Sequence, residues 1–67
     1  MIFLNGERSE LAAGETLAAA LERLGVAPDK RGVAVAVDGE VVPRAQWQSF
    51  VLSEQARVEV LTAMQGG

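Results

Sequence analysis

The sequence contains no cysteine, no histidine and no tyrosine among its 67 residues. Without cysteine, neither a disulfide framework nor a thiolate zinc site can stabilise the fold, and the imidazole that could replace a thiolate ligand is missing too. The same absences remove the side chains that act most often as nucleophile or general base. We therefore expect a chain that folds by packing alone and has no catalytic residues of its own.

Positive charge is also scarce, with six Lys and Arg against nine Asp and Glu and a formal net charge of -3. Because no basic stripe is present, we expect no nucleic-acid partner. The acids follow no metal-ligand spacing, which indicates a solvated face and no metal site. The N-terminal residues have neither the basic start nor the apolar length of a signal peptide or membrane span. We expect a cytoplasmic monomer that makes no membrane contact.

What the chain does contain is the hydrophobic content of a globular domain, 49% of its residues, arranged in short segments. Residues 1–4 and 7–11 predict two strands joined at Asn5-Gly6, a dipeptide that suits the positive φ angles of a type I′ hairpin turn. Residues 33–37 and 40–42 predict a second hairpin around Asp38-Gly39.

A helix is predicted between these hairpins, opening at residues 13–16 and running to about Leu24. Acids near its start should meet the positive end of its dipole, and Gly25 should cap its end. Leu17, Leu21 and Leu24 are expected to share its buried face.

Pro43 should end the fourth strand at a sheet edge, because proline cannot donate to a ladder. Residues 44–54 then predict a turn or 3₁₀ segment, in which we interpret Trp47 as core shielding and not as a ligand platform. Arg44 is interpreted either as a residue that steers an acidic partner or as a solvated strand end. Residues 57–62 alternate as the last strand.

The resulting order, β-β-α-β-β-β, predicts an α+β fold of the β-grasp type. We expect a mixed sheet of four to five strands with the helix packed across one face. The first and last strands should be parallel neighbours at the sheet centre. Residues 1–62 are predicted to form one domain and residues 63–67 a flexible tail.

That tail ends in Gly66-Gly67, which lack side chains and could thread a narrow channel. A terminal carboxyl is ionised at neutral pH and resists nucleophilic attack until a partner activates it. Adenylation followed by attack of a persulfide sulfur would leave a thiocarboxylate on Gly67. Since no side chain can carry sulfur as a thiol, this pattern favours a passive carrier whose working group is its terminus.

The chain resembles the sulfur carriers of thiamine thiazole biosynthesis, which are ubiquitin-like β-grasp proteins. The resemblance covers nearly the whole chain and is carried by the following pieces: Leu4-Asn5-Gly6-Glu7, Thr16-Leu17 with Leu21 and Leu24, Val35 to Arg44 with Trp47, Arg57-Val58-Glu59-Val60, and Gly66-Gly67. Glu54-Gln55-Ala56 departs from the Gly-Asp turn that the family often has before its last strand.

The resemblance implies that an E1-like adenylyltransferase uses ATP to activate Gly67, while the carrier itself binds no cofactor. Sulfur from a cysteine desulfurase system then replaces a terminal oxygen, and thiazole synthase receives it. Two relatives in chemistry remain open: the small subunit of molybdopterin synthase, and a ubiquitin-like protein modifier that is joined to lysine. A further alternative, of a different functional class, is an interaction domain whose tail has no chemical role.

Strand alternation predicts which side chains face away from the helix. We expect an apolar patch on that open sheet face, suited to partner docking. With the neighbouring tail residue Met64, its predicted members are Phe3, Ala34, Ala36, Leu61 and Met64.

Overall fold

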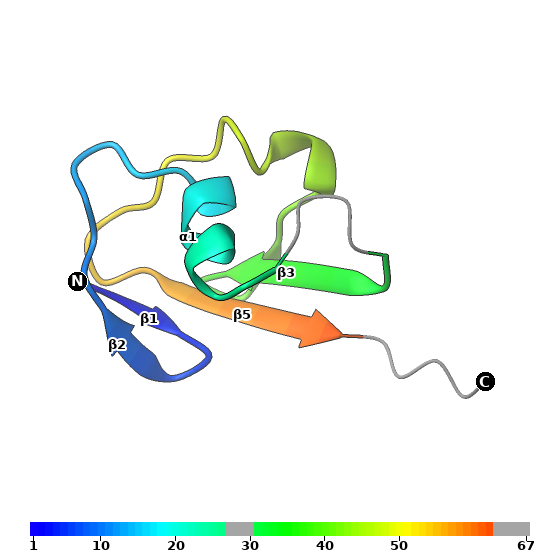
Figure 1. The fold of residues 1–67 in the computed structure, drawn as a ribbon, viewed down its shortest axis with the longest axis horizontal. Helices are drawn as coiled ribbons and strands as arrows, with labels where there is room; N and C mark the ends of the chain where they lie inside the picture. Colours follow the sequence, from blue (N-terminus) through cyan, green and yellow to red (C-terminus); the bar gives the residue numbers. More distant parts are fainter. Residues whose placement is uncertain (27–30, 63–67) are drawn as a thin grey trace.

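The computed structural model describes residues 1–26 and 31–62. Figure 1 shows the course of the chain. The elements are β1 (Ile2–Leu4), β2 (Glu7–Ser9), α1 (Leu17–Arg23), β3 (Val33–Val37), β4 (Glu40–Val41), the 3₁₀ turn η1 (Arg44–Gln46) and β5 (Arg57–Thr62). Within the described residues, no helix has the length and apolar character that a membrane crossing requires.

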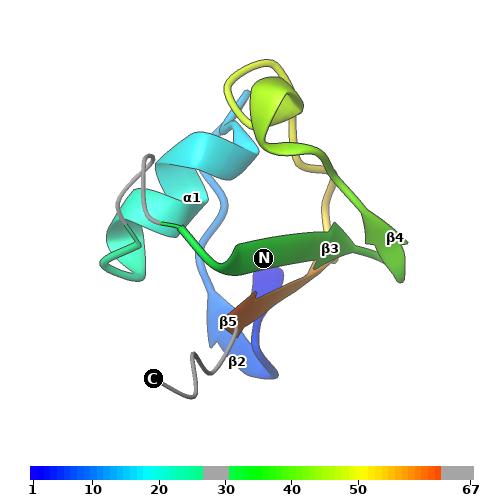
Figure 2. The same ribbon diagram turned by 90° about the vertical axis from the view of Figure 1, so that its right-hand side faces the viewer.

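The strands form a five-stranded sheet in the order β2-β1-β5-β3-β4. β1 and β5 are parallel neighbours, whereas β1 with β2, β3 with β4 and β3 with β5 pair antiparallel. Helix α1 lies across one face of this sheet, and no element within residues 1–26 and 31–62 covers the opposite face (Figure 2). The predicted α+β arrangement is confirmed, with β5 as the central strand and β4 at an edge.

Both hairpin turns have the backbone that their dipeptides predict. Asn5 and Gly6 have φ angles of 50° and 85°, and Asp38 and Gly39 have φ angles of 52° and 86°. Positive φ at both central residues is the requirement of a type I′ turn, which Asn-Gly and Asp-Gly meet at little steric cost. These turns therefore set the strand registers Leu4 opposite Glu7 and Val37 opposite Glu40.

Helix α1 begins after Thr16, whose side-chain oxygen accepts a hydrogen bond from the Ala19 N–H at 3.3 Å. The acid nearest the start of the helix, Glu15, precedes the capping residue Thr16. Its carboxylate accepts from the Ala12 N–H at 3.0 Å and pairs with Arg23 at 2.8 Å, and the first turn of the helix holds no acid. This pairing ties the segment that enters the helix to the last helical turn.

The C-terminal end of α1 is a Schellman motif, in which Gly25 N–H donates to Glu22 O and Val26 N–H donates to Leu21 O, each at 3.0 Å. The prediction that Gly25 caps the helix is thus confirmed, but the prediction that Leu24 shares the buried face is wrong. Leu24 is the C-cap residue and is 40% exposed. Val26, turned back by the motif, packs against the core instead.

The core fills the space between α1, the sheet and the segment after β4. Its members are buried hydrophobic residues of every layer: Ile2, Leu4, Leu17, Ala20, Leu21, Val35, Val37, Val42, Trp47, Leu52, Ala56 and Val58. Trp47 is 3% exposed and donates its indole N–H to the Val42 carbonyl at 2.9 Å. The interpretation of Trp47 as part of the core is confirmed.

The segment after η1 also completes the start of the helix. The Phe50 carbonyl accepts from the Leu17 N–H at 2.8 Å, and the Trp47 carbonyl accepts from the Ala18 N–H at 3.0 Å. These N–H groups have no partner inside a helix, because they precede the first intrahelical bond. Residues 47–50 are therefore held against α1 by backbone bonds as well as by apolar packing.

Candidate functional site

Two regions were predicted to act, the C-terminal residues and the open sheet face. Met64, Gly66 and Gly67 lie outside the described residues. The structure does describe Thr62, the last residue of β5, which pairs with Val33 at the beginning of β3. Because β5 starts beside Met1, whose carbonyl accepts from the Gln55 N–H at 2.7 Å, Thr62 lies at the opposite end of the sheet from the N-terminus (Figure 1).

The open face holds the other four predicted residues. Ile2, Leu4, Val35 and Val58 are buried under the helix, so the residues between them along the strands face the other way. Ala34 lies opposite Leu61 in the β3–β5 ladder, and Leu61 is 63% exposed. Phe3 and Ala36 are half-buried on the same face.

Sequence reasoning missed one residue of this face, Val41. It is 72% exposed and lies opposite Ala36 in the β3–β4 ladder. The signal was present in the Asp38-Gly39 turn, because a two-residue hairpin fixes the register of the strands that it joins. Ala34, Ala36, Val41 and Leu61 form a continuous set across β4, β3 and β5, which we call the apolar patch.

Phe3 is separated from the apolar patch by the charged residues of β5. Arg57 lies opposite Phe3 in the β1–β5 ladder, and Glu59 lies opposite Ala36 in the β3–β5 ladder. On its other side, Phe3 lies opposite Arg8 of β2. The open face is thus divided into the apolar patch, which reaches the Thr62 end of β5, and a row of Arg8, Phe3 and Arg57, which we call the arginine row.

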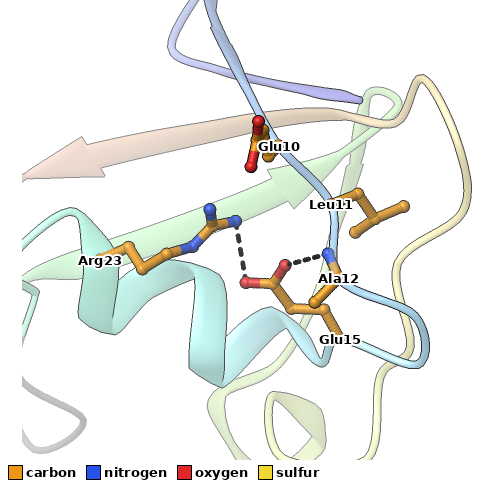
Figure 3. A pocket seen from close by; sticks show the side chains of 5 residues that line it. All are labelled: Glu10, Leu11, Ala12, Glu15 and Arg23. Carbon is orange, nitrogen blue, oxygen red and sulfur yellow. Dashed lines mark hydrogen bonds and ion pairs between the residues drawn. The ribbon is translucent and has the colours of Figure 1, made fainter.

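A surface hollow of about 200 Å³ lies where the loop before α1 meets the helix (Figure 3). Glu10, Leu11, Ala12, Glu15 and Arg23 line it. Its two central charges are already committed to each other, because Glu15 accepts from both Arg23 and the Ala12 N–H. The Glu15 and Arg23 charges therefore hold the loop against the helix, and Glu10 is the other charged residue that lines the hollow.

A second hollow of about 260 Å³ lies beside Ala18, Arg44 and Trp47. The Arg44 guanidinium lies 4.7 Å from the centroid of the Trp47 ring, at a distance typical of a cation–π contact. Arg44 thus covers the exposed edge of the core on the helix side of the molecule. Among residues 1–26 and 31–62, no three acidic side chains gather closely enough to hold a metal ion.

Known proteins are similar to this chain along nearly its whole length. The model of the ThiS family matches residues 2–67. The sulfur carrier protein ThiS of Escherichia coli K12 is 31% identical over 68 residues, covering 98% of this chain and 97% of that protein. A thiazole synthase of Magnetococcus marinus is 42% identical over 66 residues, and this chain spans only 20% of its length.

Solved structures agree with the sequence comparisons. The crystal structure of the thiamine biosynthesis protein ThiS from Geobacter metallireducens superposes with a TM-score of 0.75 at 29% identity, covering 98% of this chain and 97% of that one. A solution structure of a thiamine biosynthesis protein from the same organism gives a TM-score of 0.71. The predicted β-grasp fold and the resemblance to the sulfur carriers are both confirmed.

Proposed function

This chain belongs to the ThiS family, the sulfur carriers of thiamine biosynthesis, and we propose that the carboxyl of Gly67 is the group that carries the sulfur. The observation that supports this assignment is the extent of the family match, which runs through Gly66 to Gly67. Carriers of this family are not enzymes and bind no cofactor, so the chemistry must be supplied by partners. The chain takes part as a substrate.

The proposed loading begins at a carboxylate oxygen of Gly67. This oxygen attacks the α-phosphorus of ATP on an E1-like adenylyltransferase, which releases pyrophosphate and leaves an acyl-adenylate. The terminal sulfur of a persulfide then attacks the acyl carbon and AMP leaves. A second thiol cleaves the resulting S–S bond, so that the thiocarboxylate keeps the transferred sulfur and the thiols end as a disulfide. Glycine at both final positions leaves the acyl carbon unhindered.

Thiazole synthase is the proposed acceptor, and a cysteine desulfurase system is the proposed origin of the persulfide. The Magnetococcus relative supports the first partner, because a region similar to this chain lies within a thiazole synthase. We place the exchange in the cytoplasm, where ATP for the adenylation is available. After sulfur transfer the carrier regains its carboxylate and can be loaded again.

The proposed docking surface is the predicted set Phe3, Ala34, Ala36, Leu61 and Met64, enlarged by Val41. Its support is the exposure of Val41 and Leu61, which are 72% and 63% accessible beside two small alanines. Small side chains let a partner backbone approach the sheet closely, and exposed apolar groups gain free energy when covered. The patch lies at the end of β5 that leads into residues 63–67.

Intact-protein mass spectrometry tests the central step. The full chain is incubated with ATP, the adenylyltransferase and a persulfide donor, and we expect a mass gain equal to the exchange of one oxygen for one sulfur, located at Gly67 by fragmentation. A chain lacking Gly66 and Gly67 is the control and should show no gain. If the full chain gains no mass under conditions that load the Escherichia coli carrier, the proposal is wrong.

Two other outcomes would redirect the assignment. A stable complex with a large subunit on co-purification would support the molybdopterin synthase role. Conjugates to lysine side chains in cell extracts would support a protein modifier.

A further inference from the structure

The arginine row is the part of the open sheet face that lies outside the apolar patch. Arg8, Phe3 and Arg57 lie on the adjacent strands β2, β1 and β5, and Phe3 is the ladder partner of both arginines. Directly opposed residues point to the same side of a sheet and lie about 5 Å apart. The two guanidinium groups therefore extend from the same side of the sheet as the half-buried ring between them.

These two arginines differ from the others for which the structure gives contacts. Arg23 is paired with Glu15 at 2.8 Å, and the Arg44 guanidinium lies over Trp47. Arg8 and Arg57 are both exposed, and within residues 1–26 and 31–62 no carboxylate lies within ion-pair distance of either side chain. Glu59, on the same face of β5, does not pair with Arg57. The row presents two guanidinium groups whose nearest acidic neighbours are otherwise placed: the Asp38 carboxylate accepts from the Arg57 backbone N–H at 3.0 Å, and Glu59 lies opposite Ala36.

We propose that the arginine row is a second, electrostatic contact of the docking face, which receives acidic side chains of the enzyme that activates Gly67. This inference rests on the proposed function and adds the chemistry of the partner surface. Arginine binds carboxylates through paired N–H groups, and an aromatic ring between two arginines supplies apolar contact area. Arginine and phenylalanine are both enriched in protein interfaces.

The position of the row explains what a second contact would add. The apolar patch lies toward the Thr62 end of β5, and Arg57 is the first residue of that strand. A partner that contacts both ends of β5 can bind the sheet in one orientation only, which directs the residues after Thr62 to one place. Charge complementarity in such a contact sets register and association rate more than affinity.

The activating enzyme is the partner that such steering would serve. It must find the carrier by diffusion in each cycle, and rates of association between separate chains respond strongly to local charge. A thiazole synthase that contains a region similar to this chain, as in Magnetococcus marinus, encounters that region at a concentration set by their covalent link. For this chain we assign the steering to the activation step, which must precede every sulfur transfer.

The test is charge reversal at the row, measured as the rate of ATP-dependent pyrophosphate release with the full chain as the varied substrate. Arg8→Glu and Arg57→Glu should each lower kcat/KM by about two- to fivefold at low ionic strength, and the double variant should lower it by the product of both effects. The loss should shrink as salt is added, because the Debye length falls to about 8 Å at physiological ionic strength. The kcat at saturating carrier should not change.

Arg44→Glu is the matched control, since it makes the same change of charge on the helix side of the molecule, and it should alter kcat/KM by less than about twofold. Arg8→Lys with Arg57→Lys keeps the charge and should retain most of the salt-dependent rate. Melting temperatures of all variants check that the sheet remains folded.

The outcomes separate this inference from the proposed function. If the wild-type chain is not activated at all, the proposed function fails and the inference fails with it. If the wild type is activated and the double variant behaves like Arg44→Glu, only the inference is wrong. It is also wrong if the reversals slow sulfur transfer to thiazole synthase but leave activation unchanged, because the row would then serve the other partner.

Discussion

Gln55 occupies a backbone conformation that side chains other than glycine rarely adopt. Its φ angle is 66°, and it precedes β5 in a turn where its N–H donates to the Met1 carbonyl. The left-handed region crowds the β-carbon against the neighbouring carbonyl oxygen and costs roughly 1 kcal/mol or more. Gln55 belongs to Glu54-Gln55-Ala56, the segment in which the sequence departs from the Gly-Asp turn expected from the resemblance to the sulfur carriers, so this departure has a structural cost.

Gln55→Gly should therefore stabilise the fold. Relief of the backbone strain outweighs the larger entropy that glycine gives the unfolded chain, and we expect a net gain of about 0.5 kcal/mol, or roughly 2–4 °C in melting temperature. Gln48→Gly is the control, because Gln48 is also exposed but is not among the residues with positive φ. It should destabilise. Equal losses in thermal melts of both variants would show that Gln55 is not strained.

Leu61 is the residue through which the apolar patch can be tested. It is 63% exposed, so Leu61→Glu should leave the melting temperature within a few degrees of the wild type. The same change should lower kcat/KM for activation by about tenfold, since a charge would be buried against the partner. Val51→Glu is the matched control, with a 57% exposed side chain near the start of α1. Similar losses in both variants would contradict a docking role for the patch.

At the scale of single elements, the start of α1 shows how little of a helix cap depends on one side chain. The Thr16 oxygen satisfies only the Ala19 N–H, whereas carbonyls of Trp47 and Phe50 satisfy the two N–H groups before it. The helix is anchored by a distant part of the chain as much as by its own capping residue. This arrangement suits a helix of seven residues, which could not form alone in water.

Thr16→Ala should therefore cost only about 1 kcal/mol in the free energy of unfolding, as expected for the loss of one N-cap bond. Thr16→Ser keeps the accepting oxygen and should restore most of the difference. Chemical denaturation of the three proteins gives the comparison. A loss several times larger for Thr16→Ala would mean that the contacts of residues 47–50 depend on Thr16 as well.

The elements that sequence predicted best are those whose chemistry is local. Asn5-Gly6 and Asp38-Gly39 determine their turns by the φ angles that they tolerate, and both hairpins form as predicted. The exposure of Leu24 was not predicted, because its i, i+7 spacing from Leu17 says nothing about how far the core extends beneath the helix. That limit is set by the Schellman motif, which turns Val26 toward the core in its place.

In the candidate site, too, the features set by local sequence were predicted and those set by distant contacts were not. Period-two alternation placed Phe3, Ala34, Ala36 and Leu61 on the open face, because strand side chains must alternate. It did not show that Arg57 and Glu59 divide them, because the sequence predicted that the first and last strands are neighbours but not their register, in which Phe3 lies opposite Arg57. Val41 could have been included from the register of its hairpin alone.

At the scale of the whole molecule, the folded core and the proposed reactive group, the carboxyl of Gly67, belong to separate parts of the sequence. Every buried core residue among those described lies between Ile2 and Val58. Exposed residues of the open face such as Val41 and Leu61 can therefore change with little loss of packing, which suits a substrate that several enzymes must handle. The prediction that residues 1–62 form the domain follows from this separation and has a direct test.

A chain ended after Thr62 should unfold cooperatively with nearly the same free energy as the full chain, because it keeps the buried core between Ile2 and Val58 and the β3–β5 ladder up to Thr62. It should not be activated at all.

Gly66→Val in the full chain should likewise keep the melting temperature and lose most of its loading, since a branched side chain cannot follow glycine through a narrow channel. Thermal melts of the full chain, the truncated chain and Gly66→Val compare their stability, and intact-mass measurements compare their loading with sulfur. A large loss of stability on truncation would show that the tail is part of the domain, and full loading of Gly66→Val would show that a slim approach to Gly67 is not required.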